Sequence, residues 1–123
     1  MLRKTNQREA IRRVFEENHD PLSVQDVLDK AQEYVPRLGI ATVYRTLKSL
    51  VDEEWLQVVE IPGEASRYER AGKAHHHHFS CSRCERVFDL EGCLGGIDRL
   101  LPQGFLLEGH EIFLYGVCAD CAA

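Results

Sequence analysis

The chain has 123 residues, of which 44% are hydrophobic and 28% charged, and its formal net charge is −5 at pH 7. These values are typical of a soluble globular protein with one ordinary domain or two small ones. No apolar run reaches the roughly 18 residues of a membrane-spanning helix, and the N-terminus lacks a secretory signal. We therefore expect a cytoplasmic protein whose cysteines stay reduced.

The first half of the chain predicts three helices followed by a β-hairpin. Apolar residues at helical spacing indicate the helices, and alternating residues around a turn indicate the hairpin, in the segments 7–17, 24–34, 39–55 and 56–70. We expect Thr5 or Asn6 to cap the first helix. Ser23 is expected to cap the second, with Asp26 completing a capping box.

Three helices followed by a hairpin is the order of a winged helix-turn-helix domain, and a plain three-helix bundle with a hairpin is the alternative. In the winged domain, the N-terminal half of the third helix enters the major groove of DNA. Here that half reads IATVYRTL. With Val43 and Leu47 facing the core, three side chains point away from it: Thr42, Tyr44 and Arg45. Arg45 is suited to contact a guanine edge or a phosphate.

The net charge and the distribution of charge point in opposite directions on whether the protein binds nucleic acid. The net charge of −5 argues weakly against one, whereas residues 1–13 are locally basic. A basic segment on an acidic protein is compatible with local DNA contact, and equally with a solvated helix face.

The second half of the chain is different in kind. After a short linker at 71–74, it predicts short strands with one helix-like segment at 96–101. Two tight cysteine pairs enclose most of it: Cys81-x-x-Cys84 and Cys118-x-x-Cys121. Together they supply the four thiolates of a tetrahedral structural zinc site, which would staple a half-domain that has a thin core. A redox dithiol or unliganded cysteines are the alternatives.

Four histidines run directly into the first cysteine pair, in the stretch HHHHFSCSRC. Side chains of a strand alternate between two faces, so this run splits into two pairs. If the turn at 81–84 closes an antiparallel hairpin, position 80 faces 85, 78 faces 87 and 76 faces 89. Asp89 then lies beside His76, on the face that also carries His78. Two imidazoles and a carboxylate suit zinc, iron or manganese.

The opposite face of this strand carries His75 and His77. Two further candidate ligands lie downstream, Cys93 and His110. Three imidazoles and one thiolate form a four-coordinate set of borderline-soft character, which favours zinc. The alternatives are a buried, apolar Cys93 and a surface His110 that bind nothing.

Taken together, these features resemble the ferric uptake regulator family of metal-dependent repressors. The resemblance spans nearly the whole chain and rests on IATVYRTL, HHHHFSCSRC, FLYGVC and the paired cysteines. It implies an α+β protein that binds operator DNA as a homodimer. A winged-helix DNA-binding domain would occupy residues 1–71, and a small metal-binding dimerisation domain, stapled by the four-cysteine zinc site, would occupy 72–123.

The resemblance also implies roles for single residues, position by position. Tyr44 and Arg45 match DNA-contacting residues of the family, and the four paired cysteines match its structural zinc ligands. A regulatory site between the domains corresponds to Glu69, His76, His78 and Asp89. A further site in the dimerisation domain corresponds to His75, His77 and His110, with Cys93 about where many members carry a glutamate ligand.

One position departs from the family's pattern. Pro21 stands where iron- and peroxide-sensing members usually place a histidine, and His19 is close but out of step. The missing histidine and Cys93 favour zinc as the sensed metal. Asp89 favours iron or manganese, because peroxide-sensing members carry aspartate there.

We therefore expect a metal-activated repressor that controls metal uptake in response to zinc, with an iron- or manganese-dependent repressor as the alternative. Two other classes of function are compatible with parts of the sequence. A hydrolytic metalloenzyme would need a general base, and the sequence offers no distinctive one. A zinc-stapled interaction module without a DNA role is the third possibility.

Overall fold

The computed structural model describes residues 2–123, which form two compact units with the boundary between Lys73 and Ala74. Within residues 2–123, no helix combines the length and the apolar character that crossing a membrane requires.

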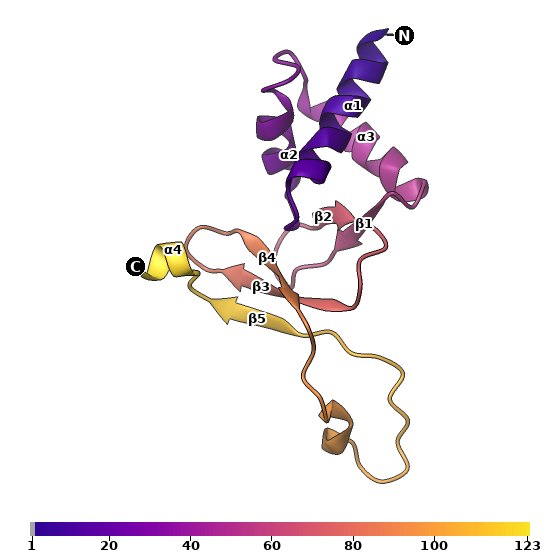
Figure 1. The fold of residues 1–123 in the computed structure, drawn as a ribbon, viewed down its shortest axis with the longest axis vertical. Helices are drawn as coiled ribbons and strands as arrows, with labels where there is room; N and C mark the ends of the chain where they lie inside the picture. Colours follow the sequence, from indigo (N-terminus) through magenta and orange to yellow (C-terminus); the bar gives the residue numbers. More distant parts are fainter. Residues whose placement is uncertain (1) are drawn as a thin grey trace. The chain divides into compact units, whose positions relative to one another are not determined.

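The first unit consists of three helices and a two-stranded antiparallel hairpin (Figure 1). Its elements are α1 (Leu2–Glu17), α2 (Val24–Ala31), α3 (Ile40–Asp52), β1 (Leu56–Val59) and β2 (Arg67–Arg70). The hairpin predicted at 56–70 is thus confirmed. Leu22 extends it through two 2.8 Å backbone hydrogen bonds with Tyr68.

The core of this unit comes from the predicted apolar positions of the helices. Fully or almost fully buried side chains meet where α1 packs on α2 and α3: Ile11, Val14, Val27, Val43, Leu47 and Leu50. Val51, also predicted to face inward, is half-buried and packs against this core. Because Val43 and Leu47 point inward, the opposite side of α3 is left facing solvent.

Local chemistry sets the limits of the helices, and not all of it was predicted. The capping box is confirmed: Asp26 N–H donates to Ser23 Oγ at 3.0 Å, and Ser23 N–H donates to the Asp26 carboxylate at 3.1 Å. The predicted caps Thr5 and Asn6 are wrong, since both lie inside α1, which begins at Leu2.

The C-terminal ends of the second and third helices come earlier than predicted. Helix α2 ends at Ala31 because the carbonyl of Ala31 takes hydrogen bonds from both Tyr34 and Val35, which turns the chain. Helix α3 begins after Gly39 and ends at Asp52, where Glu54 adopts a positive φ of 62°. This left-handed residue closes a Schellman-type cap, with hydrogen bonds from Glu54 to Val51 and from Trp55 to Leu50.

The second unit is built on a three-stranded sheet of order β4-β3-β5 (Figure 1). Its elements are β3 (His76–Cys81), β4 (Val87–Glu91), a short 3₁₀ helix η1 (Ile97–Leu100), β5 (Phe113–Gly116) and α4 (Ala119–Ala122). The central strand β3 pairs antiparallel with β4 and parallel with β5. The segment between β4 and β5 runs out beyond the end of the sheet before it returns.

The predicted register of the β3–β4 hairpin is wrong by two residues. Position 80 pairs with 87, 78 with 89 and 76 with 91. The turn is longer than assumed, because Cys81 N–H donates to Arg86 O and Glu85 N–H donates to Cys81 O, both at 3.0 Å. A shift of two residues preserves which face each side chain occupies. Asp89 therefore stays on the predicted face, but opposite His78 and not His76.

Candidate functional site

The four paired cysteines form a cluster in the second unit. Cys81 ends β3 and Cys84 lies in the turn after it, while Cys118 and Cys121 stand at the start of α4 and within it. One sulfur from each lies within 4.8 Å of the others, and the Sγ atoms of Cys84 and Cys118 are 3.8 Å apart. The cluster therefore joins the two ends of the segment that carries the sheet.

Electrostatics in this cluster fit a cation held by thiolates. Backbone N–H groups of Cys84 and Cys118 donate to Cys81 Sγ and lower the pKa of that thiol to about 6. The N–H of Cys121 lowers the pKa of Cys118 in the same way. By contrast, the hydrogen bond to Cys118 raises the pKa of Cys121 to about 12, because neighbouring thiolates resist a further negative charge. A divalent cation would remove that penalty, and four thiolates are the ligands of a structural zinc site.

Arg86 is a neighbour of this cluster that sequence reasoning missed. Its guanidinium reaches one cysteine of each pair, with 3.5 Å from Nε to Cys84 Sγ and 3.7 Å from Nη2 to Cys118 Sγ. Asp120 holds the same guanidinium at 3.0 Å. A cation beside thiolates offsets part of their negative charge. An arginine two positions after a Cys-x-x-Cys pair was the available signal.

One face of β3 brings together His76, His78 and Asp89. The Nε2 atoms of the two rings lie 3.6 Å and 3.2 Å from the same oxygen, Asp89 Oδ1. The Nδ1 of His76 is 2.8 Å from the carbonyl of Ala74, which can only accept, so Nδ1 carries the ring proton. Nε2 then presents a lone pair, which is the arrangement that metal-binding histidines use. This face offers two nitrogens and a carboxylate, and only 12–13% of the two histidine side chains and 2% of the Asp89 side chain are exposed.

Glu69, the fourth member predicted for this set, belongs to the first unit. It lies in β2, and only 1% of its surface is exposed. Gln57 Nε2 donates to its Oε2 at 2.7 Å, and Lys73 Nζ lies 3.1 Å from its Oε1. His19 lies in the turn between α1 and α2, and its carbonyl accepts a hydrogen bond from the same Lys73 ammonium.

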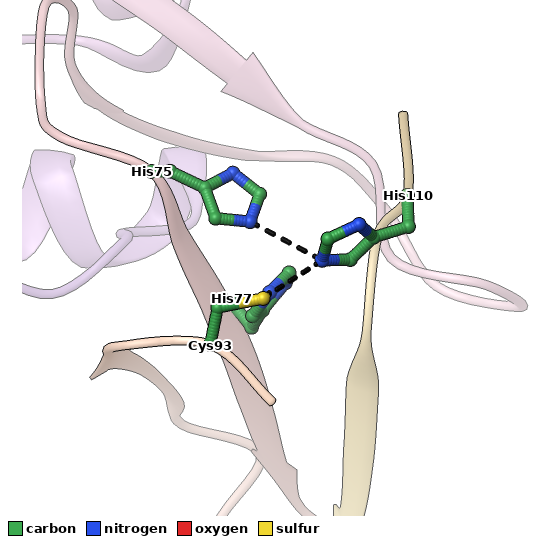
Figure 2. Close-up of side chains that lie close together, drawn as sticks. All are labelled: His75, His77, Cys93 and His110. Atoms are coloured by element: carbon green, nitrogen blue, oxygen red, sulfur yellow. Dashed lines mark hydrogen bonds between the residues drawn. The ribbon is translucent and has the colours of Figure 1, made fainter. Parts of the chain in front are cut away.

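The other face of β3 carries the second predicted set, and Figure 2 shows its four side chains pointing toward one another. They come from three segments: the start of β3, the chain just after β4 and the chain just before β5. Cys93 Sγ lies 2.9 Å from His110 Nε2 and 3.3 Å from His77 Nε2, and the Nε2 atoms of His75 and His110 are 3.4 Å apart. One ligand atom of each lies within 4.8 Å of the others.

His77 fits a metal only after one hydrogen bond is exchanged. The backbone N–H of Ile112 donates to its Nδ1 at 3.1 Å, so the proton of the neutral ring resides on Nε2 and points toward Cys93. Coordination through Nε2 requires that proton to leave. Burial lowers the pKa of His77, and His75 and His110 lower it further. The ring is therefore neutral at neutral pH, which is the charge state that binds metal.

The three residues predicted to contact DNA lie on the side of α3 away from the core. Tyr44 is 57% exposed, and Arg45 is exposed with its Nη2 3.1 Å from Thr42 Oγ1. Beside them is an open cavity of about 420 Å³, lined by Tyr44, Arg45, Lys48, Val51, Asp52, Val58 and Tyr68. The helix thus presents an aromatic ring and two cations to solvent.

The second unit also exposes a large apolar surface. Large apolar side chains between β4 and β5 and on β5 itself are at least 43% exposed: Leu94, Leu100, Phe105, Leu106, Leu107, Leu114 and Tyr115. Among the described residues, β5 pairs on one side only, with β3. Apolar surface of this extent is typical of a protein interface.

Comparisons with known proteins agree on one family. The sequence pattern described as "Ferric uptake regulator family" matches residues 1–115. A "Ferric uptake regulation protein" of Bacillus subtilis is 36% identical, with 95% of this chain and 83% of the relative covered. A "Zinc uptake regulation protein" of Mycobacterium tuberculosis is 32% identical, with 98% of this chain and 95% of the relative covered. A solved "zinc-bound manganese uptake regulator" is similar with a TM-score of 0.80 and 28% identity, over 91% of this chain and 87% of its own.

Proposed function

Since the chain belongs to the ferric uptake regulator family of metal-responsive transcription regulators, which are not enzymes, we propose that it is a metal-activated repressor of metal uptake genes. Regulators of this family act as DNA-binding dimers. The proposed repressor binds operator DNA as a homodimer when its regulatory metal is bound. The observation that carries this proposal is the pairing of a solvent-facing α3 with metal-ligand clusters in the same chain.

The proposed DNA-binding element is a winged helix-turn-helix formed by the three helices and the β1–β2 hairpin. Exposed Tyr44 and Arg45, with Thr42 beside them, support its placement in the major groove, where arginine recognises guanine bidentately. Lys48 on the same side is suited to a phosphate. The acidic net charge then matters little, because only this surface would meet the DNA.

The proposed structural metal is zinc on Cys81, Cys84, Cys118 and Cys121. Four sulfurs within reach of one ion, with N–H donors and Arg86 around them, support it. Zinc at such a site supplies a tetrahedral crosslink of the chain. Backbone N–H groups of this chain lower the pKa of Cys81 and so favour the thiolate form, which is the form that binds zinc.

The proposed regulatory site consists of His76, His78 and Asp89 in the second unit, with Glu69 contributed by the first unit. The shared contacts of both imidazoles with Asp89 Oδ1 support the first three. Glu69 is included on the family resemblance. Ligands from both units would favour one angle between them when metal is bound. Two recognition helices fit DNA at one spacing, so that angle couples metal binding to DNA binding.

We propose zinc as the sensed metal, with iron or manganese as the alternative. Support for zinc comes from the second cluster, where Cys93 adds a thiolate to His75, His77 and His110. Thiolate ligands favour zinc over manganese, whereas the carboxylates of Glu69 and Asp89 suit iron and manganese as well. The names of the relatives include iron, zinc and manganese, so they do not decide between these ions.

The proposed homodimer uses the exposed apolar residues of the second unit. Leu100, Leu106 and the open edge of β5 offer surface that a second copy would cover. Light scattering at micromolar concentration with zinc present should report a dimer. A monomer under these conditions contradicts this part of the proposal.

A DNA-binding titration tests the function as a whole. Duplexes are first selected from a random library with the zinc-loaded protein, and their binding is followed by fluorescence anisotropy at buffered free zinc, iron and manganese. Binding should require metal and fall steeply with salt concentration, because phosphate contacts release counterions. Activation by zinc at far lower free concentration than by the others supports zinc. Activation by iron or manganese alone, abolished by peroxide, assigns the alternative, and metal-independent binding rejects the switch.

A further inference from the structure

Lys73 holds the buried carboxylate of Glu69 in an ion pair. The Nζ atom lies 3.1 Å from Glu69 Oε1, and only 15% of the Lys73 side chain and 1% of the Glu69 side chain are exposed. The same ammonium donates to the backbone carbonyl of His19. An ion pair so sheltered from water is screened far less by salt than an exposed pair. The lysine therefore occupies a defined position beside this carboxylate.

The second oxygen of Glu69 is also taken. Gln57 Nε2 donates to Oε2 at 2.7 Å, so each carboxylate oxygen faces a nitrogen donor. Each oxygen keeps a further lone pair, so a metal ion bound to Glu69 would share a carboxylate oxygen with one of these donors and lie close to it. Of the two donors, only Lys73 carries a positive charge, and a divalent cation repels that charge.

We propose that Lys73 competes with the regulatory metal for Glu69 and so sets the metal concentration at which the regulator is loaded. This inference rests on the proposed function, in which Glu69 is a ligand of the regulatory site. Nothing in the sequence singled out Lys73. Its position four residues after Glu69, across the turn that follows β2, is the only signal it leaves.

Two physical effects act in the same direction. Without metal, the ammonium compensates a carboxylate that would otherwise be buried with an unbalanced charge, which is costly. With metal, the ammonium either leaves its place or stays and is repelled by the ion. The first effect lowers the free energy of the metal-free state and the second raises that of the metal-bound state. Both weaken metal binding, and removal of the charge should strengthen it.

Metal binding to the full chain, measured without DNA, tests this directly. Mn²⁺ is the probe, because oxygen and imidazole ligands suit it and the four-thiolate cluster does not. The electron paramagnetic resonance signal of free Mn²⁺ reports its binding. Two variants remove the charge: Lys73→Met, and Lys73→Gln, which keeps an N–H donor for the His19 carbonyl. Both should bind Mn²⁺ about tenfold more tightly than the unaltered chain, as expected for the loss of one nearby unit charge.

Matched variants separate the possible outcomes. Lys30→Met on α2 makes the same change in net charge and should leave the affinity unchanged. Glu69→Gln should weaken binding, and Lys73→Gln should then add nothing, because coupled residues are not additive. If both Lys73 variants bind Mn²⁺ as the unaltered chain does, or more weakly, the competition is refuted while Glu69 keeps its role. If Glu69→Gln binds as the unaltered chain does, the proposed regulatory site itself is wrong.

Discussion

His78 stands directly opposite Asp89 in the β3–β4 ladder, and its Nε2 lies 3.2 Å from Asp89 Oδ1. His76, two residues earlier on the same face, reaches the same oxygen at 3.6 Å. One carboxylate oxygen thus lies close to the Nε2 atoms of two imidazoles, and pairing in the sheet places all three side chains on one face.

Asp89→Ala should therefore weaken metal-dependent DNA binding. Metal affinity should fall by at least about 10- to 100-fold, which is the typical cost of removing a residue that only supports a metal ligand. Anisotropy titrations with buffered metal measure it. Asp98→Ala, at an exposed acid of η1, removes the same charge and should change little. Equal behaviour of the two variants would exclude Asp89 from the regulatory site.

Cys81→Ser should abolish tight zinc binding at the four-cysteine cluster. Metal binding at such a site is coupled to folding, so the second unit should unfold or the protein should become monomeric. Metal content by mass spectrometry and light scattering report both changes. Cys93→Ser, in the other cluster, should keep the structural zinc. A Cys81→Ser protein that remains a folded dimer without zinc would refute the crosslink.

Arg45→Ala should weaken operator binding by about 1–3 kcal/mol if this side chain recognises a base. The metal content should stay unchanged, because α3 lies in the unit without the cysteine and histidine clusters. Arg13→Ala on α1, whose guanidinium pairs with Glu17, is the control. An equal loss for Arg13→Ala would mean that the effect is general electrostatics.

Cys93→Asp should shift the metal preference of the second cluster from zinc toward manganese, because a carboxylate replaces its only thiolate. Cobalt bound there should lose the sulfur-to-metal absorption band in the near ultraviolet. His110→Ala removes an imidazole of the same cluster and should lower its affinity for all of these ions. An unchanged preference in Cys93→Asp would show that Cys93 is not a ligand.

The pKa of His77 gives a pH dependence to the protein freed of weakly bound metal. At pH above 6.5, the ordinary pKa of histidine, folded and unfolded chains both hold this ring neutral. Below it, the unfolded chain binds a proton that the buried ring resists, so the free energy of unfolding falls. His77→Gln should therefore lose less stability than the unaltered chain between about pH 7 and about pH 5, in urea titrations. Equal losses of stability in the two proteins over this pH range would contradict the account.

Periodic and local signals were sufficient to predict most elements of the fold and the residues of all three side-chain clusters except Glu69, which the family resemblance supplied. Ser23 and Asp26 form their capping box within four residues, and alternation in the histidine run places odd and even positions on opposite faces whatever the exact pairing. The pairing itself depends on how many residues the turn contains. The hydrogen bond from Cys81 N–H to Arg86 O closes a turn that is two residues longer than the predicted one. A shift of two residues leaves every side chain on its predicted face, so Asp89 still lies beside both imidazoles.

Residues that act only through distant contacts could not be predicted in this way. Arg86 contacts Cys118 only because the parallel pairing of β5 with β3 brings that cysteine close to it. Lys73 contacts the buried carboxylate of Glu69 and the backbone carbonyl of His19, which is far away in the sequence. Arginine and lysine are both common in proteins, so the spacing of Arg86 from the cysteine pair and of Lys73 from Glu69 was not enough to identify these contacts in advance.

The alternation of the histidine run has a consequence for how the chain reaches its folded state. In the unfolded chain, residues 75–78 are adjacent on a flexible backbone and can close around one ion together. Pairing of β3 with β4 and β5 divides this single chelator into two sets of different ligand chemistry. An ion held by both odd and even histidines before the sheet forms opposes folding, because it binds the unfolded chain. If the proposed sites bind metal, excess free metal should therefore slow refolding, although the same ion would stabilise the chain once the sheet has separated the two faces.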